Sequence, residues 1–261
     1  MIRFISACVL CAPFWMTLAT AAEQTAAATD TAAIVKQMAQ TYSACKSYRD
    51  TGTSLTKFLG DTPFENKVEF KTAFRRPAEF RFEYTSDHDV MQDRMIIHRD
   101  KAGTRTWWSV GGGEENTTID AAIAGATGVS SGTAFNVPTM LFPDEVGGWS
   151  FLSPEDWSAL PDAEENGRSC YRLTRKEENG DHETVWIGKA NFLLIRIDER
   201  RTIDGDRGTF VTEQTTLYQP EVNVDVPNAE LEFNPPANVL KTPARNPQSR
   251  LLRLLKALLR T

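Results

Sequence analysis

Hydrophobic and polar residues alternate along much of the chain from Thr51 onward, which is the pattern of β-strands with one buried and one wet face. Segment 64–74 (FENKVEFKTAF) places aromatic residues and a valine on one face and charged residues on the other. Segment 79–84 (EFRFEY) repeats this pattern. Further strands are expected at Met91–His98, Thr104–Val110, Cys170–Arg175, Thr184–Gly188, Phe192–Glu199, Thr209–Leu217 and Leu231–Phe233. The Asp-Gly dipeptide in 203–206 (IDGD) predicts a tight hairpin between the last two long strands.

Two stretches have helical rather than alternating patterns. Ile34, Met38 and Tyr42 form one stripe of a front helix, with Asp30 or Thr31 as its N-cap. Between residues 120 and 158 we expect a short helix, a Gly/Ser-rich loop, a second apolar helix or turn, and a capped helix start at 153–157. No βαβ rhythm is present, so the sheet should be antiparallel. The fold class is therefore mainly β (α+β). Its helices either cover the apolar face of the sheet completely or leave a hydrophobic groove between helix and sheet.

The N-terminus has the pattern of a secretory signal peptide over residues 1–22. A short basic start precedes an apolar run and an Ala-x-Ala site, and the run is shorter than the ~20 residues that a membrane-spanning helix needs. A polar, low-complexity arm follows at 23–31. These features predict export across the inner membrane to the periplasm.

Cleavage would remove two of the four cysteines and leave Cys45 and Cys170. Two cysteines in an exported protein favour one disulfide, because the compartment is oxidising. The alternative is a pair of buried free thiols.

Charge is distributed unevenly along the chain. Its formal net charge is −6, yet the last 21 residues hold six basic and no acidic residues. The acidic body argues against nucleic acid as a partner, whereas the basic end should favour anionic surfaces.

The basic end divides into a Pro-containing hinge (241–248) and an amphipathic helix (249–261). Leucines cover one side of this helix and basic residues the other; we take as its contact surface Leu251, Leu255, Leu258, Arg253 and Lys256. At ~1.5 Å per residue the helix is too short to span a bilayer core of ~30 Å. It could lie on an anionic membrane surface, fold back onto its own domain, or dock on a partner protein.

No catalytic constellation is found, so an enzyme is not expected. The Gly-x-Ser-x-Gly match at 128–132 lacks the strand–turn–helix context of a nucleophile, which makes Ser130 a turn residue and a lipid hydrolase a remote alternative. The three histidines lack metal-ligand spacing, and the glycine run at 111–113 lacks the Lys-Ser/Thr of a phosphate loop. No metal or cofactor is predicted.

Four stretches, in order, resemble the LolA/LolB-like lipoprotein-carrier superfamily, in particular its branch of uncharacterised outer-membrane lipoprotein-sorting proteins. They are AFRRPAEFRFEY (73–84), MIIHRDKAGTRTWWS (from 95), TAFNVPTMLFP (133–143) and LEFNPPANV (231–239). The resemblance covers most of the predicted domain at 32–240. The loop 111–118, the helical insertion and the basic end depart from the pattern.

This resemblance implies an incomplete antiparallel β-barrel with helices covering its open mouth and an interior that receives acyl chains. The implied wall and lid residues are Phe70, Phe74, Phe80, Phe82, Trp107, Met140, Leu141 and Phe142. Arg76 falls where the family ties its lid to the barrel, so we expect it to bond carbonyls of segment 124–141. The implied function is non-catalytic binding of a lipid or lipoprotein. The alternative is a sensor or regulatory module of the same fold that acts on a membrane partner.

Overall fold

The computed structural model describes residues 30–60, 63–88, 91–146, 156–176, 179–205 and 208–236. The predicted signal peptide, hinge and amphipathic helix lie outside the described residues, as does most of the predicted arm. Asp30 and Thr31, at the end of that arm, belong to the first helix instead. Asp30 is its N-cap and accepts a hydrogen bond from the backbone N–H of Ala33 at 2.9 Å.

Within the described residues, twelve strands form one antiparallel sheet. The strands are β1 (Ser47–Leu59), β2 (Phe64–Arg75), β3 (Glu79–His88), β4 (Met91–Asp100), β5 (Gly103–Trp108), β6 (Gly112–Thr117), β7 (Ser158–Glu165), β8 (Arg168–Lys176), β9 (His182–Gly188), β10 (Leu194–Gly205), β11 (Gly208–Tyr218) and β12 (Glu221–Val222). The helices are α1 (Thr31–Ala44), α2 (Ile119–Thr127), α3 (Thr133–Leu141) and α4 (Asn228–Leu231). The spatial order is β6-β5-β4-β3-β2-β1-β11-β10-β9-β8-β7, and β12 pairs with β1.

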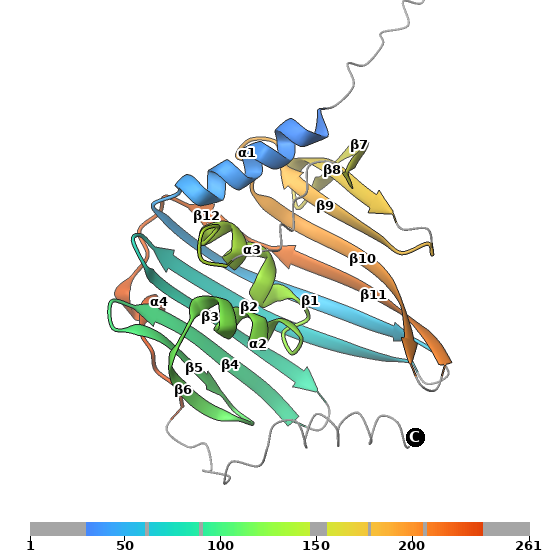
Figure 1. Cartoon of the computed structure of the whole chain (residues 1–261). Helices are drawn as coiled ribbons and strands as arrows, with labels where there is room; N and C mark the ends of the chain where they lie inside the picture. The colour runs from blue at the N-terminus through green and yellow to red at the C-terminus, as the bar shows by residue number, and fades with distance from the viewer. Residues whose placement is uncertain are drawn as a thin grey trace, which may run out of the picture.

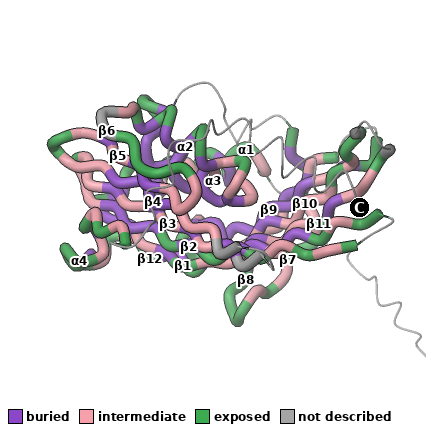
Figure 2. Tube along the Cα trace, turned by 90° about the horizontal axis from the view of Figure 1, so that it is seen from below, coloured by how far each residue is buried: buried purple, intermediate pink, exposed green. Residues whose placement is uncertain are grey.

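The sheet curls without closing, and its inner face holds the main core (Figures 1 and 2). Helices α1, α2 and α3 lie on this face, with α1 along one end of the strands, whereas α4 lies on the outer face. This is the incomplete barrel with covering helices that the resemblance implied. Tyr42 of α1 fixes the helix to the sheet, because its hydroxyl accepts the backbone N–H of Leu194 at 3.0 Å.

The alternation in β2 and β3 translates directly into burial. Val68, Phe70 and Phe74 are buried on the inner face, while Glu69 and Lys71 between them are exposed. The predicted Asp-Gly hairpin is also confirmed, since β10 and β11 pair up to Gly205 and Gly208.

Two expectations about secondary structure were wrong. Residues 231–233 do not form a strand, because the chain makes the short helix α4 and then runs irregularly over the outer face. The predicted loop at 111–118 contains strand β6. The helix start expected at 153–157 falls largely outside the described residues, and strand β7 begins after it at Ser158. Both strands are edges of the sheet. The described part of β7 is mostly exposed, so no alternating apolar pattern marks it.

Candidate functional site

Four phenylalanines of β2 and β3 form an aromatic wall on the inner face: Phe70, Phe74, Phe80 and Phe82. Phe74 pairs directly with Phe80 across the two strands, so their rings share one face. None of the four side chains is more than 2% exposed. The sequence therefore predicted these members of the wall and their common orientation.

The wall is covered by a lid, which we define as residues 119–142 (α2, α3 and Phe142) (Figure 1). The ring of Phe142 stands edge-on to both Phe74 and Phe80, at 5.3 Å from each centroid. Met140 and Leu141 are buried beside it. In this state the lid itself fills the space against the wall.

The sequence places Trp107 in this wall, and the structure corrects that expectation. Trp107 pairs with Ile96, whereas Trp108 pairs with Met95, which in turn pairs with the inner-face Tyr84. Because successive strand residues point to opposite faces, Trp107 lies on the outer face and Trp108 on the inner one. The indole N–H of Trp108 donates to Asp93 at 2.6 Å.

Arg76 joins the lid to the front helix. Its guanidinium donates to the carbonyl oxygens of Cys45 at 2.8 Å and Leu141 at 3.4 Å, and it also reaches carbonyls in the last turn of α1. The expected contact with the end of segment 124–141 is thus present, but most acceptors belong to α1. These carbonyls are ones that a helix end leaves unsatisfied. The role of Arg76 as a lid latch remains a prediction.

We expect Arg76→Gln to loosen the lid, because the shorter amide cannot reach both helix ends. Hydrogen bonds from a charged donor contribute about 1.5–3 kcal/mol each, so amide exchange in residues 133–146 should accelerate by about tenfold or more relative to strand β9. Hydrogen-exchange mass spectrometry measures this. Arg175→Gln is the matched control, since Arg175 also lies on the inner face but pairs with Glu183 of the sheet. Equal acceleration in both variants would contradict the latch.

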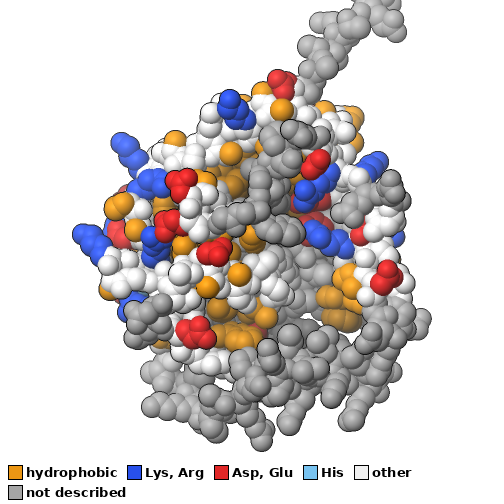
Figure 3. Space-filling model, in the orientation of Figure 1, with side chains coloured by type: hydrophobic (Ala, Val, Ile, Leu, Met, Phe, Trp, Pro, Cys, Tyr) orange, Lys and Arg blue, Asp and Glu red, His pale blue; other side chains and the backbone are white. Residues whose placement is uncertain are grey.

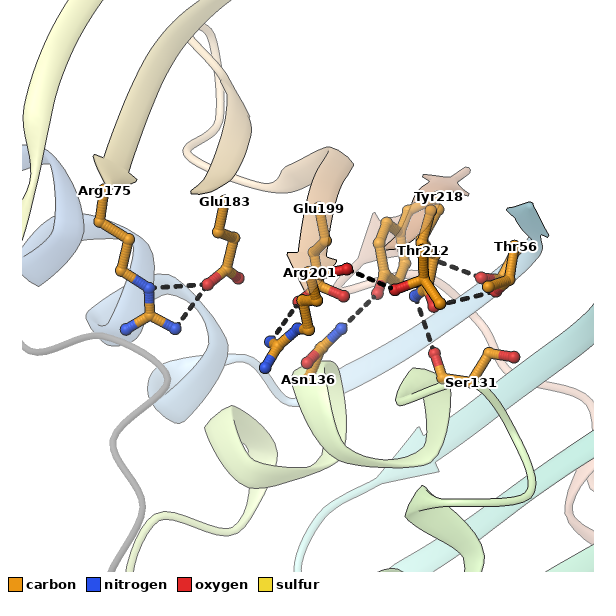
Figure 4. Close-up of polar contacts among 12 residues, drawn as sticks. Thr56, Ser131, Asn136, Arg175, Glu183, Glu199, Arg201, Thr212 and Tyr218 are labelled. Carbon is orange, nitrogen blue, oxygen red and sulfur yellow. Dashed lines mark hydrogen bonds and ion pairs between the residues drawn. The ribbon is translucent and has the colours of Figure 1, made fainter. Parts of the chain in front are cut away.

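A polar belt crosses the inner face beneath the tip of the lid (Figure 4). The side-chain amide of Gln214 donates to the carbonyl of Ser131 at 2.9 Å, and its oxygen accepts from Thr56 at 3.0 Å. On α3, Asn136 donates to the hydroxyl of Tyr218 at 3.0 Å. A few polar bonds at the tip of the lid thus add to its apolar packing on the wall, and Arg76 donates to Leu141 at the other end of the lid.

Charged residues extend this belt over β8, β9 and β10 (Figure 4). Arg175 forms an ion pair with Glu183, which lies directly across from Glu199, and Arg201 pairs with Glu199. Burial raises the pKa of Glu183, and the neighbouring carboxylate of Glu199 adds to the rise, while Arg175 opposes it. The inner face is consequently not uniformly apolar, as alternation alone suggested.

Beyond the belt, apolar residues return at the far ends of the strands. We call Phe58, Phe64, Ile203 and Phe210 the mouth cluster. The rings of Phe58 and Phe64 stack at 4.1 Å, the three phenylalanines are half-buried and Ile203 is 38% exposed. Hydrophobic side chains come to the surface on the lid side of the molecule (Figure 3). Phe64 belongs to the alternating segment 64–74, but no motif singles out the cluster, because only the pairing of β1 with β2 and β11, and of β10 with β11, brings its members together.

The predicted disulfide is absent, since Cys45 and Cys170 are both buried free thiols. Each sulfur has its own neighbours: Cys45 donates to the carbonyl of Tyr42, and Cys170 to that of Arg168. Burial raises the pKa of both thiols, which keeps them protonated. The alternative of two buried thiols is the one that the structure shows.

Ser130 is a turn residue, as the sequence indicated. It is fully buried, and its hydroxyl oxygen accepts the backbone N–H of Ala134 at 3.1 Å at the start of α3. No group of three or more potential metal-ligating side chains lies together within the described ranges. Among these same ranges, no helix is long and apolar enough to cross a membrane.

Comparisons with known proteins find likeness in fold but not in sequence. No protein-family profile matches the chain, and no curated protein matches its sequence. A putative outer membrane lipoprotein-sorting protein domain from Vibrio parahaemolyticus is 9% identical, with 76% of this chain and 94% of that one covered and a TM-score of 0.34. A LolA superfamily protein from Nitrosomonas europaea is 11% identical to this chain. The match covers 80% of this chain and 99% of that protein, with a TM-score of 0.29.

MucB, compared through its crystal structure, is 10% identical to this chain in sequence. The match covers 78% of this chain and 63% of MucB, with a TM-score of 0.43. All three TM-scores lie below 0.5, so these likenesses carry no weight in the functional argument. The chain is similar in fold to structures of a lipoprotein-sorting protein domain and of a LolA superfamily protein.

Proposed function

We propose that this protein is a non-catalytic periplasmic carrier that holds acyl chains of a lipid or lipoprotein between the inner face of the sheet and the lid. The observation that carries the proposal is the mouth cluster, where aromatic side chains are left partly exposed on the same face as the lid. Soluble proteins rarely expose contiguous apolar surface unless it binds something.

The way in which the lid is attached supports this proposal. Its underside is apolar, with Ile123, Ala126 and Leu141 buried, and it is held to the sheet by this apolar packing and by a handful of polar bonds. Movement of the lid would expose the aromatic wall, and an acyl chain entering from the mouth cluster would replace the contacts that Phe142 makes. Burying each CH₂ group contributes about 0.8 kcal/mol, so a long chain could offset the loss of those contacts.

The polar belt fits a ligand that is not purely hydrocarbon. A chain lying from the mouth cluster toward the wall would pass Gln214 and the charged residues of β9 and β10. The amphipathic segment predicted at 249–261 would bring such a carrier to an anionic membrane surface or to a membrane-protein partner.

Binding of an acyl probe tests the carrier directly. We expect the protein to bind undecanoic acid labelled with dansyl, with a rise in dansyl fluorescence, and Phe58→Glu to weaken binding by about tenfold or more, because a carboxylate at the mouth must be desolvated by the chain. Leu59→Glu is the matched control, since Leu59 is the next residue of β1, points to the outer face and is 40% exposed. Equal losses in the two variants, or no uptake by the unmodified protein, would refute the proposal.

Native mass spectrometry of the protein purified from the periplasm separates the carrier from the alternative of a sensor or regulatory module. A co-purifying lipid adduct supports the carrier. A clean protein mass, together with no probe uptake on titration, favours the regulatory module.

A further inference from the structure

The outer face of the sheet, opposite the lid, carries a groove of about 620 Å³ between the α4 segment and the central strands. Its floor is formed by the outward-facing sides of β1, β2 and β3, where the small residues Thr51 and Ala73 leave room. Ala229, Glu230 and Asn234 of the chain around α4 form one wall. We call this site the outer groove.

Basic side chains outnumber the carboxylates that face the outer groove. The basic residues are Arg49, Lys71, Arg81, Arg94 and Arg168, and the carboxylates are Glu83, Glu221 and Glu230. The carboxylate of Asp50, which also borders this region, turns to the inner face and accepts from Tyr48. The groove therefore has two positive charges in excess, in a domain that is otherwise acidic.

All three carboxylates are already engaged. Glu83 is shared by two guanidinium groups, at 2.6 Å from Arg81 and in contact with Arg94. Arg49 holds both Glu221 and Glu230.

Two cations of the groove remain available to a ligand. Lys71 and Arg168 are exposed and make no ion pair with any described residue. An incoming anion could thus bind without breaking an existing pair.

The strand register spreads the cations along a line across the sheet. Arg81 pairs with Ala73, and Ala73 pairs with Arg49; in the adjacent row Glu83 pairs with Lys71. At about 4.8 Å between strands, the span from β4 to β1 is about 14 Å. A site for a single phosphate would instead converge several donors on one point. Separated cations suit a ligand with several separated acid groups, and five extended residues span about 16 Å.

We infer that the outer groove binds an extended acidic peptide segment of a partner protein, whose carboxylates pair with Lys71 and Arg168 in the positive field of the other arginines. Guanidinium groups match carboxylates in geometry, which gives such a contact register as well as charge. Because the groove lies on the face opposite the lid, a partner could hold the protein while the inner face remains available.

Fluorescence anisotropy tests this inference with the full chain. The probe is a fluorescein-labelled hexapeptide of alternating Glu and Gly, and a Lys-Gly peptide is the probe of opposite charge. We expect only the acidic probe to bind, more weakly as salt rises from about 50 to 300 mM. The double variant Lys71→Glu with Arg168→Glu should lose affinity by about tenfold or more.

The matched control is Lys36→Glu with Lys101→Glu, which changes the net charge equally at exposed sites on α1 and in the β4–β5 turn. This control should retain affinity within about twofold, and thermal unfolding should show that both double variants are folded. Equal loss in both, or no binding of the acidic probe, would overturn the inference. Displacement of the probe by millimolar inorganic phosphate, with phosphate binding lost in the groove variant, would show a single-anion site and overturn the peptide assignment.

Discussion

Replacing Gly52 by alanine should destabilise the protein by about 3 kcal/mol or more, a large effect for the addition of one methyl group. A Cβ atom at Gly52 would lie 2.2 Å from the ring of Phe70 and 2.4 Å from the backbone oxygen of Leu217. The ring has little room to move, because it packs edge-on against Tyr218 at 5.3 Å between centroids. The oxygen belongs to the pairing of β1 with β11, so the centre of the sheet would have to shift. Urea unfolding measures the change.

Gly125→Ala is the matched control, because it introduces the same group in α2, where a Cβ would meet no atom within 4 Å. Alanine is the better helix former, so this variant should be more stable by about 0.5–1 kcal/mol. If Gly52→Ala were as stable as the unmodified protein, the Phe70 ring would not lie as close to the backbone of β1 as the structure places it.

Replacing Asp50 by asparagine should stabilise the protein at neutral pH and remove part of its pH dependence. Asp50 is buried on the inner face of β1, and its Oδ2 accepts the hydroxyl of Tyr48 at 2.6 Å. Burial raises the pKa of Asp50 to about 6, although hydrogen bonds from Tyr48 and Thr72 oppose the rise. The unfolded chain has a pKa of about 3.9 for aspartate, so the folded protein holds this proton more tightly. The contribution of Asp50 to stability is therefore greatest below pH ~4 and falls as the pH rises through about 6, by about 3 kcal/mol in total.

Urea unfolding at several pH values between 4 and 7.5 tests this prediction. Asp50→Asn should resemble the unmodified protein near pH 4 and exceed it by up to about 3 kcal/mol near pH 7.5, since the amide carries no charge to desolvate. Asp144→Asn, in an exposed turn, should instead follow the pH profile of the unmodified protein. If Asp50→Asn were no more stable than the unmodified protein at pH 7.5, the carboxylate of Asp50 would not be buried as the structure shows it.

The two-residue pattern predicted eight of the twelve described strands, β2 to β5 and β8 to β11, and it is clearest where one face is strongly apolar. In β2 and β3 most inner positions are aromatic or aliphatic, so the two-residue period shows both the strand and the buried face. Strand β1 lies between β2 and β11, yet its inner positions include Asp50, Ser54 and Thr56, which bond within the polar network. A buried strand whose polar groups are satisfied by neighbours from distant segments carries no such period.

The candidate site was predictable only in part for the same reason. Four wall phenylalanines and the position of Arg76 follow from motif and period. The prediction that Trp107 belongs to the aromatic wall was wrong. Trp107 and Trp108 are adjacent and point to opposite faces, and only the pairing of Trp108 with Met95 and of Trp107 with Ile96 shows which of them lies on the inner face. The disulfide rested on the number of cysteines alone, which says nothing of where each sulfur points. The belt and the outer groove depend on the register between distant strands, and no local pattern encodes it.

The strand order brings β1 and β11, the first and the last long strands described, together at the centre of the sheet. Strands β1 to β6 each pair with the next strand in sequence, as do β7 to β11. The other edge of β1 can pair only after β11 has been synthesised. When the chain emerges with its N-terminus first, the earlier half would expose an unpaired hydrogen-bonding edge at β1 until almost the whole polypeptide is available. Such late, long-range closure slows folding and favours aggregation, so a molecular chaperone that shields β1 should raise the yield of the folded protein.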